Sequence, residues 1–206
     1  FVSQEEELIR IIPVVKAILK EFPEALLSID TFRSSVAQEC LNNGAALIND
    51  ISAGNLDEKM MEVISKYNVP YIMMHLRGTP QTMQNQTNYK HLINEIITYF
   101  SDKISKARNL GINDLIIDPG FGFSKTTDQN FEILSNLELF KMLDLPILTG
   151  ISRKSMIYKT LDTTPEEALN GTTVLNTIAI TKGANIIRVH DVKEALECIK
   201  LCEKLR

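Results

Sequence analysis

The sequence predicts an α/β protein, a (β/α)8 TIM barrel of which this chain carries six βα units. Short apolar runs of strand length alternate with helical stretches along the whole chain, as in a parallel sheet. Every apolar run is followed by polar or charged side chains, which would meet at one rim of a closed barrel. An open doubly wound sheet would accept the same alternation, but it gathers its ligand groups at one switch point. We therefore favour the barrel.

Six apolar runs predict the strands. They are Leu26 to Ile29, Ala45 to Ile48, Tyr71 to Met74, Leu115 to Ile117, Pro146 to Leu148 and Ile186 to Val189. Six strands cannot close an eight-stranded ring, so we expect the first two strands and their loops to lie upstream of Phe1. Residues 1–206 are then one N-terminally incomplete barrel domain.

Helix signals lie between these runs. Ser3 and Glu6 form a capping box for a helix to about Phe22. Other predicted starts are Asn55 with Glu58, Thr164 with Pro165 and Glu167, and Asp191 with Glu194, and predicted ends are Gly44, Gly111 and Gly183.

Composition excludes several classes of protein. The 206 residues carry a net charge of −4, so no basic field attracts nucleic acid or anionic membrane. The sequence contains neither a signal peptide nor an apolar run of about 18 residues, so it does not predict export or a membrane span. Cys40, Cys198 and Cys202 lie in helical patterns without metal-ligand motifs, which predicts free thiols and a cytoplasmic location.

The stretch from Leu115 to Phe123 is the most informative part of the chain. A buried strand ends at Asp118, and Gly120 and Gly122 then allow tight turning and close approach of a ligand to the main chain. Phe121 and Phe123 place flat apolar surfaces beside the carboxylate. This combination predicts a site for a flat, polar heterocycle, although Asp118 with Pro119 could also simply form a turn.

The first three strand ends offer further candidates, each with a structural alternative. Asp30 could bind a ligand or cap the next helix. Asn49 can donate and accept at the edge of a heterocycle, whereas Asp50 could equally bond loop amides. We expect His75 to be a supporting structural histidine, and Met74 to form an apolar wall or part of the core.

Two later stretches predict donors for oxygen atoms and anions. Ser152, Arg153, Lys154 and Ser155 follow the fifth strand, where cations can point at ring atoms or a carboxylate instead of solvent. Arg188 and His190 are two apart on the predicted sixth strand, and Asp191 begins the next helix. Because a helix N-terminus attracts anions, this second stretch predicts an anion site.

Taken in order, these runs resemble the dihydropteroate synthases. The runs that carry the resemblance are Ser28 to Thr31, Ile48 to Asp50, Met74 and His75 with Gly78 to Met83, Asp118 to Phe123, Ser152 to Ser155, and Arg188 to Asp191. The resemblance implies a transferase of folate biosynthesis that condenses 6-hydroxymethyl-7,8-dihydropterin diphosphate with 4-aminobenzoate to give 7,8-dihydropteroate and diphosphate. It also implies inhibition by sulfonamides, a homodimer and Mg²⁺.

The resemblance also assigns roles to individual positions. It implies pterin binding by Asp30, Asn49, Met74, Asp118, Gly122 and Lys154, an aminobenzoate site at Phe123, Lys154 and Ser155, and diphosphate binding by Arg188 and His190. Asp30, Lys154, Arg188 and His190 would act in catalysis. The family's Asn ligand to the metal would lie upstream, leaving no metal ligand in this chain.

Two alternatives stay open at this point. A pterin-binding methyltransferase that moves a methyl group from methyltetrahydrofolate to a corrinoid protein would share the barrel and the pterin site, but it holds no diphosphate. The runs at Ser152 and Arg188 therefore count against it. A non-catalytic pterin-binding module is the second alternative.

Overall fold

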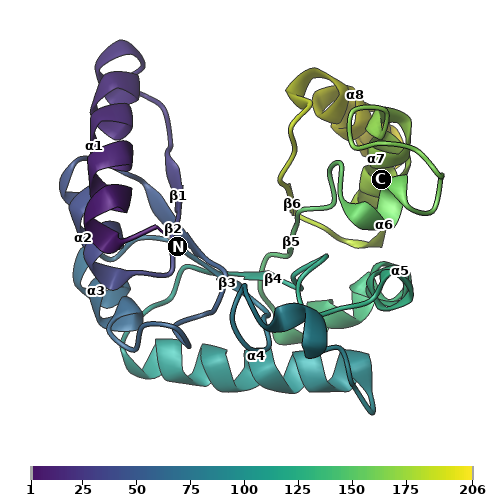
Figure 1. Ribbon diagram of the computed structural model, residues 1–206, viewed down its shortest axis with the longest axis horizontal. Helices are drawn as coiled ribbons and strands as arrows, with labels where there is room; N and C mark the ends of the chain where they lie inside the picture. The colour runs from purple at the N-terminus through teal and green to yellow at the C-terminus, as the bar shows by residue number, and fades with distance from the viewer. Residues whose placement is uncertain (1, 206) are drawn as a thin grey trace. The chain divides into compact units, whose positions relative to one another are not determined.

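Parallel strands alternate with helices in the computed structural model, which describes residues 2–205 (Figure 1). The chain forms two compact units: the first is Phe1–Met74 with Asp102–Ile116, and the second is His75–Ser101 with Ile117–Arg206. The assignment of residues 1–206 to one domain stays a prediction. No helix among the described residues is both long enough and apolar enough to cross a membrane.

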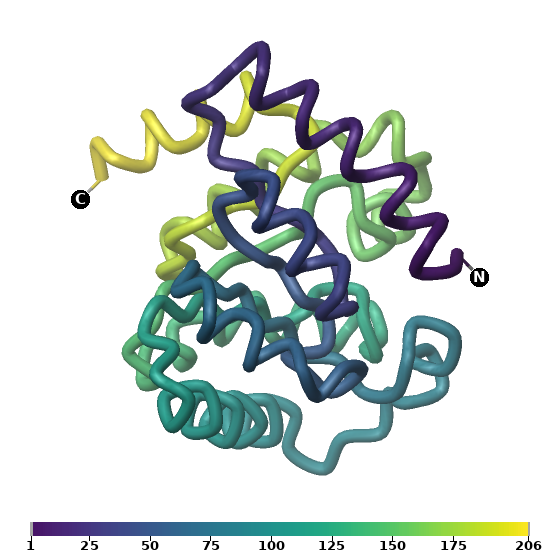
Figure 2. The backbone as a smooth tube through the Cα atoms, turned by 90° about the vertical axis from the view of Figure 1, so that its left-hand side faces the viewer, coloured from purple at the N-terminus to yellow at the C-terminus, as the bar shows by residue number. Residues whose placement is uncertain are grey.

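The first unit places a parallel sheet beside three helices. Its elements are α1 Gln4–Glu21, β1 Ser28–Asp30, α2 Ser34–Asn42, β2 Leu47–Asp50, α3 Met60–Tyr67 and β3 Tyr71–Met74. β1 pairs with β2 and β2 with β3, all parallel, and the register sets Asp30 beside Asn49. Figures 1 and 2 show α2 lying between α1 and α3. The side chains of Ile48, Met60, Ile64 and Tyr71 are fully buried in this unit.

The second unit contains a two-stranded parallel sheet and most of the later helices. Its elements are the 3-10 helices η1 Met83–Asn85, η2 Leu137–Leu143 and η3 Glu203–Leu205, the helices α5 Thr127–Ser135, α6 Ser155–Tyr158, α7 Leu169–Lys182 and α8 Val192–Cys202, and the strands β5 Leu148–Thr149 and β6 Ile186–Ile187. β5 pairs with β6, and α7 packs on α8. Phe100, Phe121 and Phe140 are fully buried.

Two elements belong partly to each unit: α4 Leu92–Asn109 and β4 Leu115–Asp118. The strand order β1-β2-β3-β4 makes β4 the last strand of the larger sheet. Asp30, Asp50 and Asp118 are the last residues of β1, β2 and β4, as expected for polar groups at strand ends. β6 is shorter than predicted and ends at Ile187, so Arg188 and His190 both lie beyond the strand.

The helix signals were right at the first and the last of the four predicted starts and wrong at the two between them. Ser3 is the N-cap of α1, and its Oγ accepts a hydrogen bond from the N–H of Glu6 at 3.2 Å. α3 begins at Met60 and α7 at Leu169, each later than the polar residues at Asn55 and Thr164 predicted. Asp191 is the N-cap of α8 but makes no capping bond, because its carboxylate binds a distant arginine.

The predicted helix ends and the free thiols are confirmed. Gly44, Gly111 and Gly183 all have positive φ angles, of 95°, 80° and 110°. Cys40, Cys198 and Cys202 are free and buried. Burial raises the pKa of Cys40 to about 11, which keeps that thiol protonated and unreactive.

Candidate active site

Asp118 ends β4 with a carboxylate that is 1% exposed. Its Oδ1 accepts the N–H of Gly120 at 2.8 Å, which fixes the start of the loop. Its Oδ2 lies 3.8 Å from Nη2 of Arg188. The carboxylate thus organises the turn, which confirms that interpretation, and it also faces a cation; its role in binding a heterocycle stays a prediction.

The loop after Asp118 is held by the side chain of Lys154. The ammonium of Lys154 donates to the carbonyl of Phe121 and lies 4.8 Å from the centre of the Phe123 ring. A Cβ added at Gly122 would meet Cδ of Lys154 at 3.4 Å, so the lysine stem passes close over the bare backbone. The structure therefore brings Gly122, Phe123 and Lys154 together, and Ser155 follows directly as the first residue of α6.

Arg188 lies across the backbone of Gly150, where a Cβ would come within 2.9 Å of Nη2. The absence of a side chain at Gly150 gives the guanidinium room to reach toward Asp118. The backbone N–H of Arg188 donates to the carbonyl of Thr149 at 2.9 Å, which ties the residue to the end of β5. Arg188 is thus placed by main-chain pairing and a neighbouring glycine.

His190 is joined to Ser152. The backbone N–H of His190 donates to Ser152 Oγ at 3.2 Å, and the same oxygen lies 2.9 Å from Nδ1 of the ring. While its oxygen accepts the backbone N–H, the hydroxyl of Ser152 can donate a hydrogen bond to Nδ1 of His190. The neutral ring then carries its hydrogen on Nε2. His190 can then donate from Nε2 to an anion.

Arg153 and Asp191 have a structural role that the sequence analysis did not foresee. Nε and Nη2 of Arg153 donate to the two carboxylate oxygens of Asp191 at 2.9 and 2.8 Å, and Nη1 donates to the carbonyls of Pro165 and Glu166. The hydrogen bonds from Arg153 lower the pKa of Asp191. This bidentate pair ties the loop that carries Lys154 to the segment that carries His190, so Arg153 is not a free donor for ligand.

In the first unit, Asp30 and Asn49 are neighbours in the parallel register of β1 and β2. Asp30 is exposed and does not cap α2, whose N-cap is Arg33. Asn49 is 3% exposed, and its Oδ1 has no hydrogen-bond partner among residues 2–205. A buried acceptor without a donor is rare in native proteins and is consistent with a residue that meets a ligand.

Asp50 is structural. Its carboxylate is fully buried and accepts the N–H and the hydroxyl of Ser52, the N–H of Gly54 and the hydroxyl of Tyr71. The alternative in which Asp50 bonds loop amides is therefore confirmed. Met74 is also fully buried, at the end of β3.

His75 is a buried structural histidine, as predicted, and it leads to a residue that the sequence analysis missed. Its Nδ1 lies 3.0 Å from Nζ of Lys125. Burial, with the charges of Lys125 and Arg77, lowers the pKa of His75 well below its usual value, so the ring is neutral. Lys125 follows the loop directly, and no local sequence pattern marked it as different from a surface lysine before a helix.

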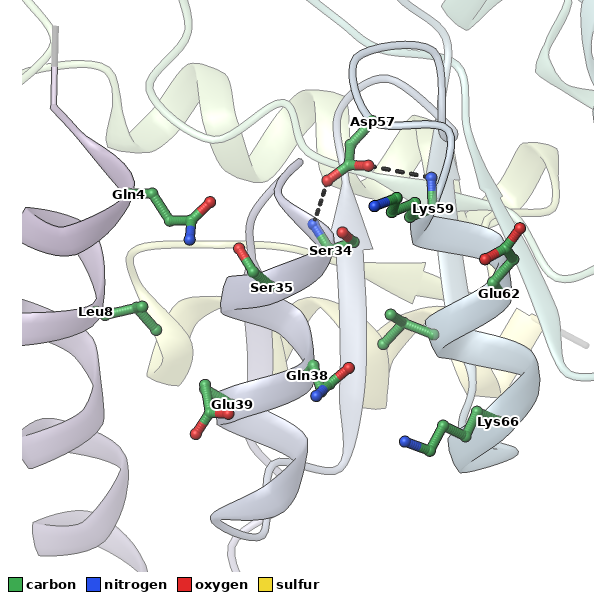
Figure 3. Close-up of a pocket in the computed structure, with 11 residues that line it drawn as sticks. Gln4, Leu8, Ser34, Ser35, Gln38, Glu39, Asp57, Lys59, Glu62 and Lys66 are labelled. Atoms are coloured by element: carbon green, nitrogen blue, oxygen red, sulfur yellow. Dashed lines mark hydrogen bonds between the residues drawn. The ribbon is translucent and has the colours of Figure 1, made fainter.

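None of the predicted site residues lines the cavity of about 900 Å³ along α1, α2 and α3 (Figure 3). At the upper end of this cavity in the figure, Asp57 accepts the N–H of Ser34 at 2.7 Å and that of Lys59 at 3.0 Å. Although burial alone would raise the pKa of Asp57, these hydrogen bonds bring it below its usual value. Asp57 therefore caps the start of α2.

Gly120 is the position in the loop where a side chain fits least. We expect Gly120→Ala to destabilise the protein more than Gly111→Ala does. Both glycines have φ near +80°, but only a Cβ at Gly120 meets another atom within 4 Å, the carbonyl oxygen of His75 at 2.3 Å. Left-handed backbone costs an alanine about 1–2 kcal/mol at either site, and overpacking adds roughly 1–3 kcal/mol at Gly120. Urea unfolding measures the difference, and equal losses would show that the loop moves aside freely.

Comparisons with known proteins identify the family of this chain. Residues 1–190 match the family of pterin-binding enzymes. The chain is 42% identical over 207 residues to the dihydropteroate synthase of Synechocystis, covering 99% of this chain and 71% of that protein. It is 41% identical to the dihydropteroate synthase of Escherichia coli K12, covering 98% and 72%.

A crystal structure gives the same result in three dimensions. The dihydropteroate synthase of Yersinia pestis, in complex with a sulfonamide drug, matches with a TM-score of 0.95 at 39% identity and covers all of this chain and 75% of that chain. The predicted α/β TIM-barrel fold is confirmed by this match. The chain belongs to the pterin-binding enzyme family and, within that family, to the dihydropteroate synthases.

Proposed function

We propose that this chain catalyses the condensation of 6-hydroxymethyl-7,8-dihydropterin diphosphate with 4-aminobenzoate, which gives 7,8-dihydropteroate and diphosphate. The observation that carries the proposal is the grouping, within the second unit, of a buried carboxylate and two cations around one glycine-containing loop. Arg188 lies 3.8 Å from Asp118, and Lys154 lies over Phe123. The relatives named above are synthases, so the methyltransferase alternative falls away.

The pterin is assigned to Asp118, Asn49 and Lys154, with Asp30, Met74 and Gly122 as further members of the predicted set. A carboxylate can accept two N–H bonds from the guanidine-like edge of the pterin, and a lysine can donate to its carbonyl oxygen. The unpartnered Oδ1 of Asn49 supports its part in this assignment. That all these residues contact one ligand stays a prediction.

The reaction itself needs a good leaving group more than a strong base. As the C–O bond between the pterin methylene and diphosphate breaks, the electron pair leaves with the diphosphate and positive charge develops on the pterin. Arg188 and His190 can stabilise the departing anion, and Asp30 can stabilise the cation. The amine of 4-aminobenzoate then forms the C–N bond and releases its proton to water.

Phe123, Lys154 and Ser155 are assigned to 4-aminobenzoate. The Phe123 ring offers a flat apolar surface, and the ammonium of Lys154 already lies 4.8 Å from its centre. We therefore propose that sulfonamides compete at this place. A homodimer and a cytoplasmic location also remain proposals, and the exposed apolar side chains of Val174, Leu196 and Leu201 on α7 and α8 support a dimer.

We propose that Mg²⁺ would enter the site bound to the diphosphate of the substrate. In the described part of the chain, no group of three or more His, Cys, Asp or Glu side chains could hold a metal ion. These residues alone therefore do not fit a metal centre, and no catalytic step is assigned to the metal.

The decisive assay measures diphosphate release from the dihydropterin diphosphate with Mg²⁺, with and without 4-aminobenzoate, in the intact polypeptide that contains this chain. Release that depends on 4-aminobenzoate supports the synthase. Pterin binding without release would favour the non-catalytic alternative.

Arg188→Ala tests the diphosphate assignment in the same assay. We expect release to slow by roughly 10- to 100-fold, because a charge-assisted bond to an anion contributes about 1.5–3 kcal/mol. Arg108→Ala, at an exposed arginine in the last turn of α4, is the matched control. A fall no greater than that of the control would show that Arg188 does not bind the leaving group.

A further inference from the structure

Lys125 is a buried lysine whose three ammonium hydrogens all have acceptors. The residue is 4% exposed. Its Nζ lies 3.0 Å from His75 Nδ1, 3.0 Å from the carbonyl oxygen of Gly120 and 2.9 Å from that of Phe123. Because His75 is neutral, its Nδ1 can accept. A buried ammonium with three such bonds is ordered, and it is attached to the loop that carries Gly122 and Phe123.

Lys125 holds the part of the loop around Gly122, where the backbone has no regular secondary structure. Residues 119–124 contain no helix or strand. Outside the turn itself, the N–H of Gly122 donates to Oδ1 of Asn130 at 2.7 Å, and the carbonyl of Phe121 accepts Lys154. At the end of the loop, Ser124 accepts the N–H of Arg77 on its Oγ at 3.1 Å and the hydroxyl of Tyr89 on its carbonyl at 3.0 Å. The carbonyls of Gly120 and Phe123 are those that Lys125 holds. Two lysines thus hold three carbonyls of the loop: Lys125 binds those of Gly120 and Phe123, and Lys154 binds that of Phe121.

Four titratable or charged groups surround Lys125. Burial lowers its pKa to about 7; Asp118 opposes the shift, and Lys154 and Arg77 add to it. The fourth is the neutral His75. Arg77 is paired with Glu95, and its guanidinium carbon lies 3.7 Å from the centre of the Tyr89 ring.

We propose that Lys125 is a positioning residue for the pterin, which holds the loop from Asp118 to Phe123 in its binding conformation without touching the substrate. The inference rests on the proposed function, because it uses the pterin site assigned above. The ammonium of Lys125 binds the carbonyls of Gly120 and Phe123, on either side of Gly122, so its loss frees both carbonyls at once. Asp118 is affected indirectly, through the N–H of Gly120 that it accepts.

The test compares Lys125→Met with Lys200→Met, an equal change at an exposed lysine in the last turn of α8. We expect the Kd for the dihydropterin diphosphate, measured by calorimetry without 4-aminobenzoate, to rise about tenfold or more in Lys125→Met, because two buried carbonyls lose a donor at about 1–2 kcal/mol together. The control should bind as the unsubstituted protein does. A Kd for folded Lys125→Met within twofold of the control would overturn the proposal.

A pH profile separates positioning from a general loss of stability, and its main measurement uses only the unsubstituted protein. Above pH 7 the neutral amine has two hydrogens for three acceptors, so pterin affinity in the unsubstituted protein should fall severalfold between about pH 6 and 8.5. Lys125→Met should lack this fall, whatever the other groups contribute. A flat profile in the unsubstituted protein would contradict the role. Pterin binding without diphosphate release would instead count against the proposed function and leave the positioning role intact.

Discussion

Asp118→Asn should lower kcat/KM for the pterin diphosphate by about 100- to 1,000-fold, the largest catalytic effect expected of any single change in this chain. Asparagine keeps the shape of the side chain but removes its charge and one acceptor. The amide oxygen of the asparagine can still accept the N–H of Gly120. The amide NH₂ would then take the place of Oδ2, which faces Arg188. Breaking a buried charge-assisted contact costs about 2–5 kcal/mol, which converts to losses of this size.

The control for this prediction lies at the other end of the same strand. Asp114 is exposed and precedes β4, so Asp114→Asn makes the same chemical change without touching the loop. Steady-state kinetics and pterin calorimetry on both variants measure the effect. If Asp118→Asn folds normally and loses less than fivefold in kcat/KM, the carboxylate serves the turn alone and the pterin assignment is wrong.

The strand ends were predictable because they depend on local sequence. A strand that is buried on both faces consists of apolar residues. A carboxylate or amide after such a run therefore indicates that the strand ends nearby. Asp30 and Asp118 end β1 and β4 for this reason, whereas β2 continues one residue past Asn49 to Asp50. The helix ends at glycine were equally local, since left-handed backbone there favours a residue without Cβ.

The roles of polar residues that pair across long distances in the sequence were not predictable. Arg153 and Asp191 are far apart in the chain, and nothing near either residue indicates that they bind each other. Consequently Asp191 was correctly placed at the start of a helix, but the partner of its side chain was missed, and Arg153 was taken as a possible ligand donor. Lys125 was missed for the same reason, because its acceptors are brought to it by the fold.

The choice between ligand and structure at Asn49 and Asp50 shows the same limit. The two residues are adjacent, equally polar and both buried. The structure separates them by their hydrogen bonds: Asp50 has four donors from its own unit, whereas Oδ1 of Asn49 has none among the described residues. The sequence analysis favoured Asn49 as the ligand residue because an amide can both donate and accept hydrogen bonds. The absence of a donor for its Oδ1 among the described residues supports that preference.

Asp50→Ala should cause the largest loss of stability. The substitution removes the acceptor of four hydrogen bonds, which come from Ser52, Gly54 and Tyr71, and each lost bond costs about 1–3 kcal/mol. The charge of Asp50 also favours the protonated form of Lys103, a largely buried lysine whose pKa burial lowers. Because the neighbours relax and water enters, we expect the free energy of unfolding to fall by about 3–5 kcal/mol in urea titrations.

Tyr71→Phe provides the graded comparison, because it removes one donor from the same carboxylate and leaves the ring in the core. We expect Tyr71→Phe to lower the free energy of unfolding by about 1–1.5 kcal/mol. The double variant with Asp50→Ala should lose less than the sum of the two single losses, because both changes remove the same Tyr71–Asp50 bond. Asp102→Ala, at an exposed aspartate in α4, controls for the loss of a negative charge. If the two changes simply add, the bond between Tyr71 and Asp50 does not stabilise the fold. If Asp50→Ala costs no more than Asp102→Ala, none of the four bonds does. Asp50 would then have to be reconsidered as a ligand residue beside Asn49.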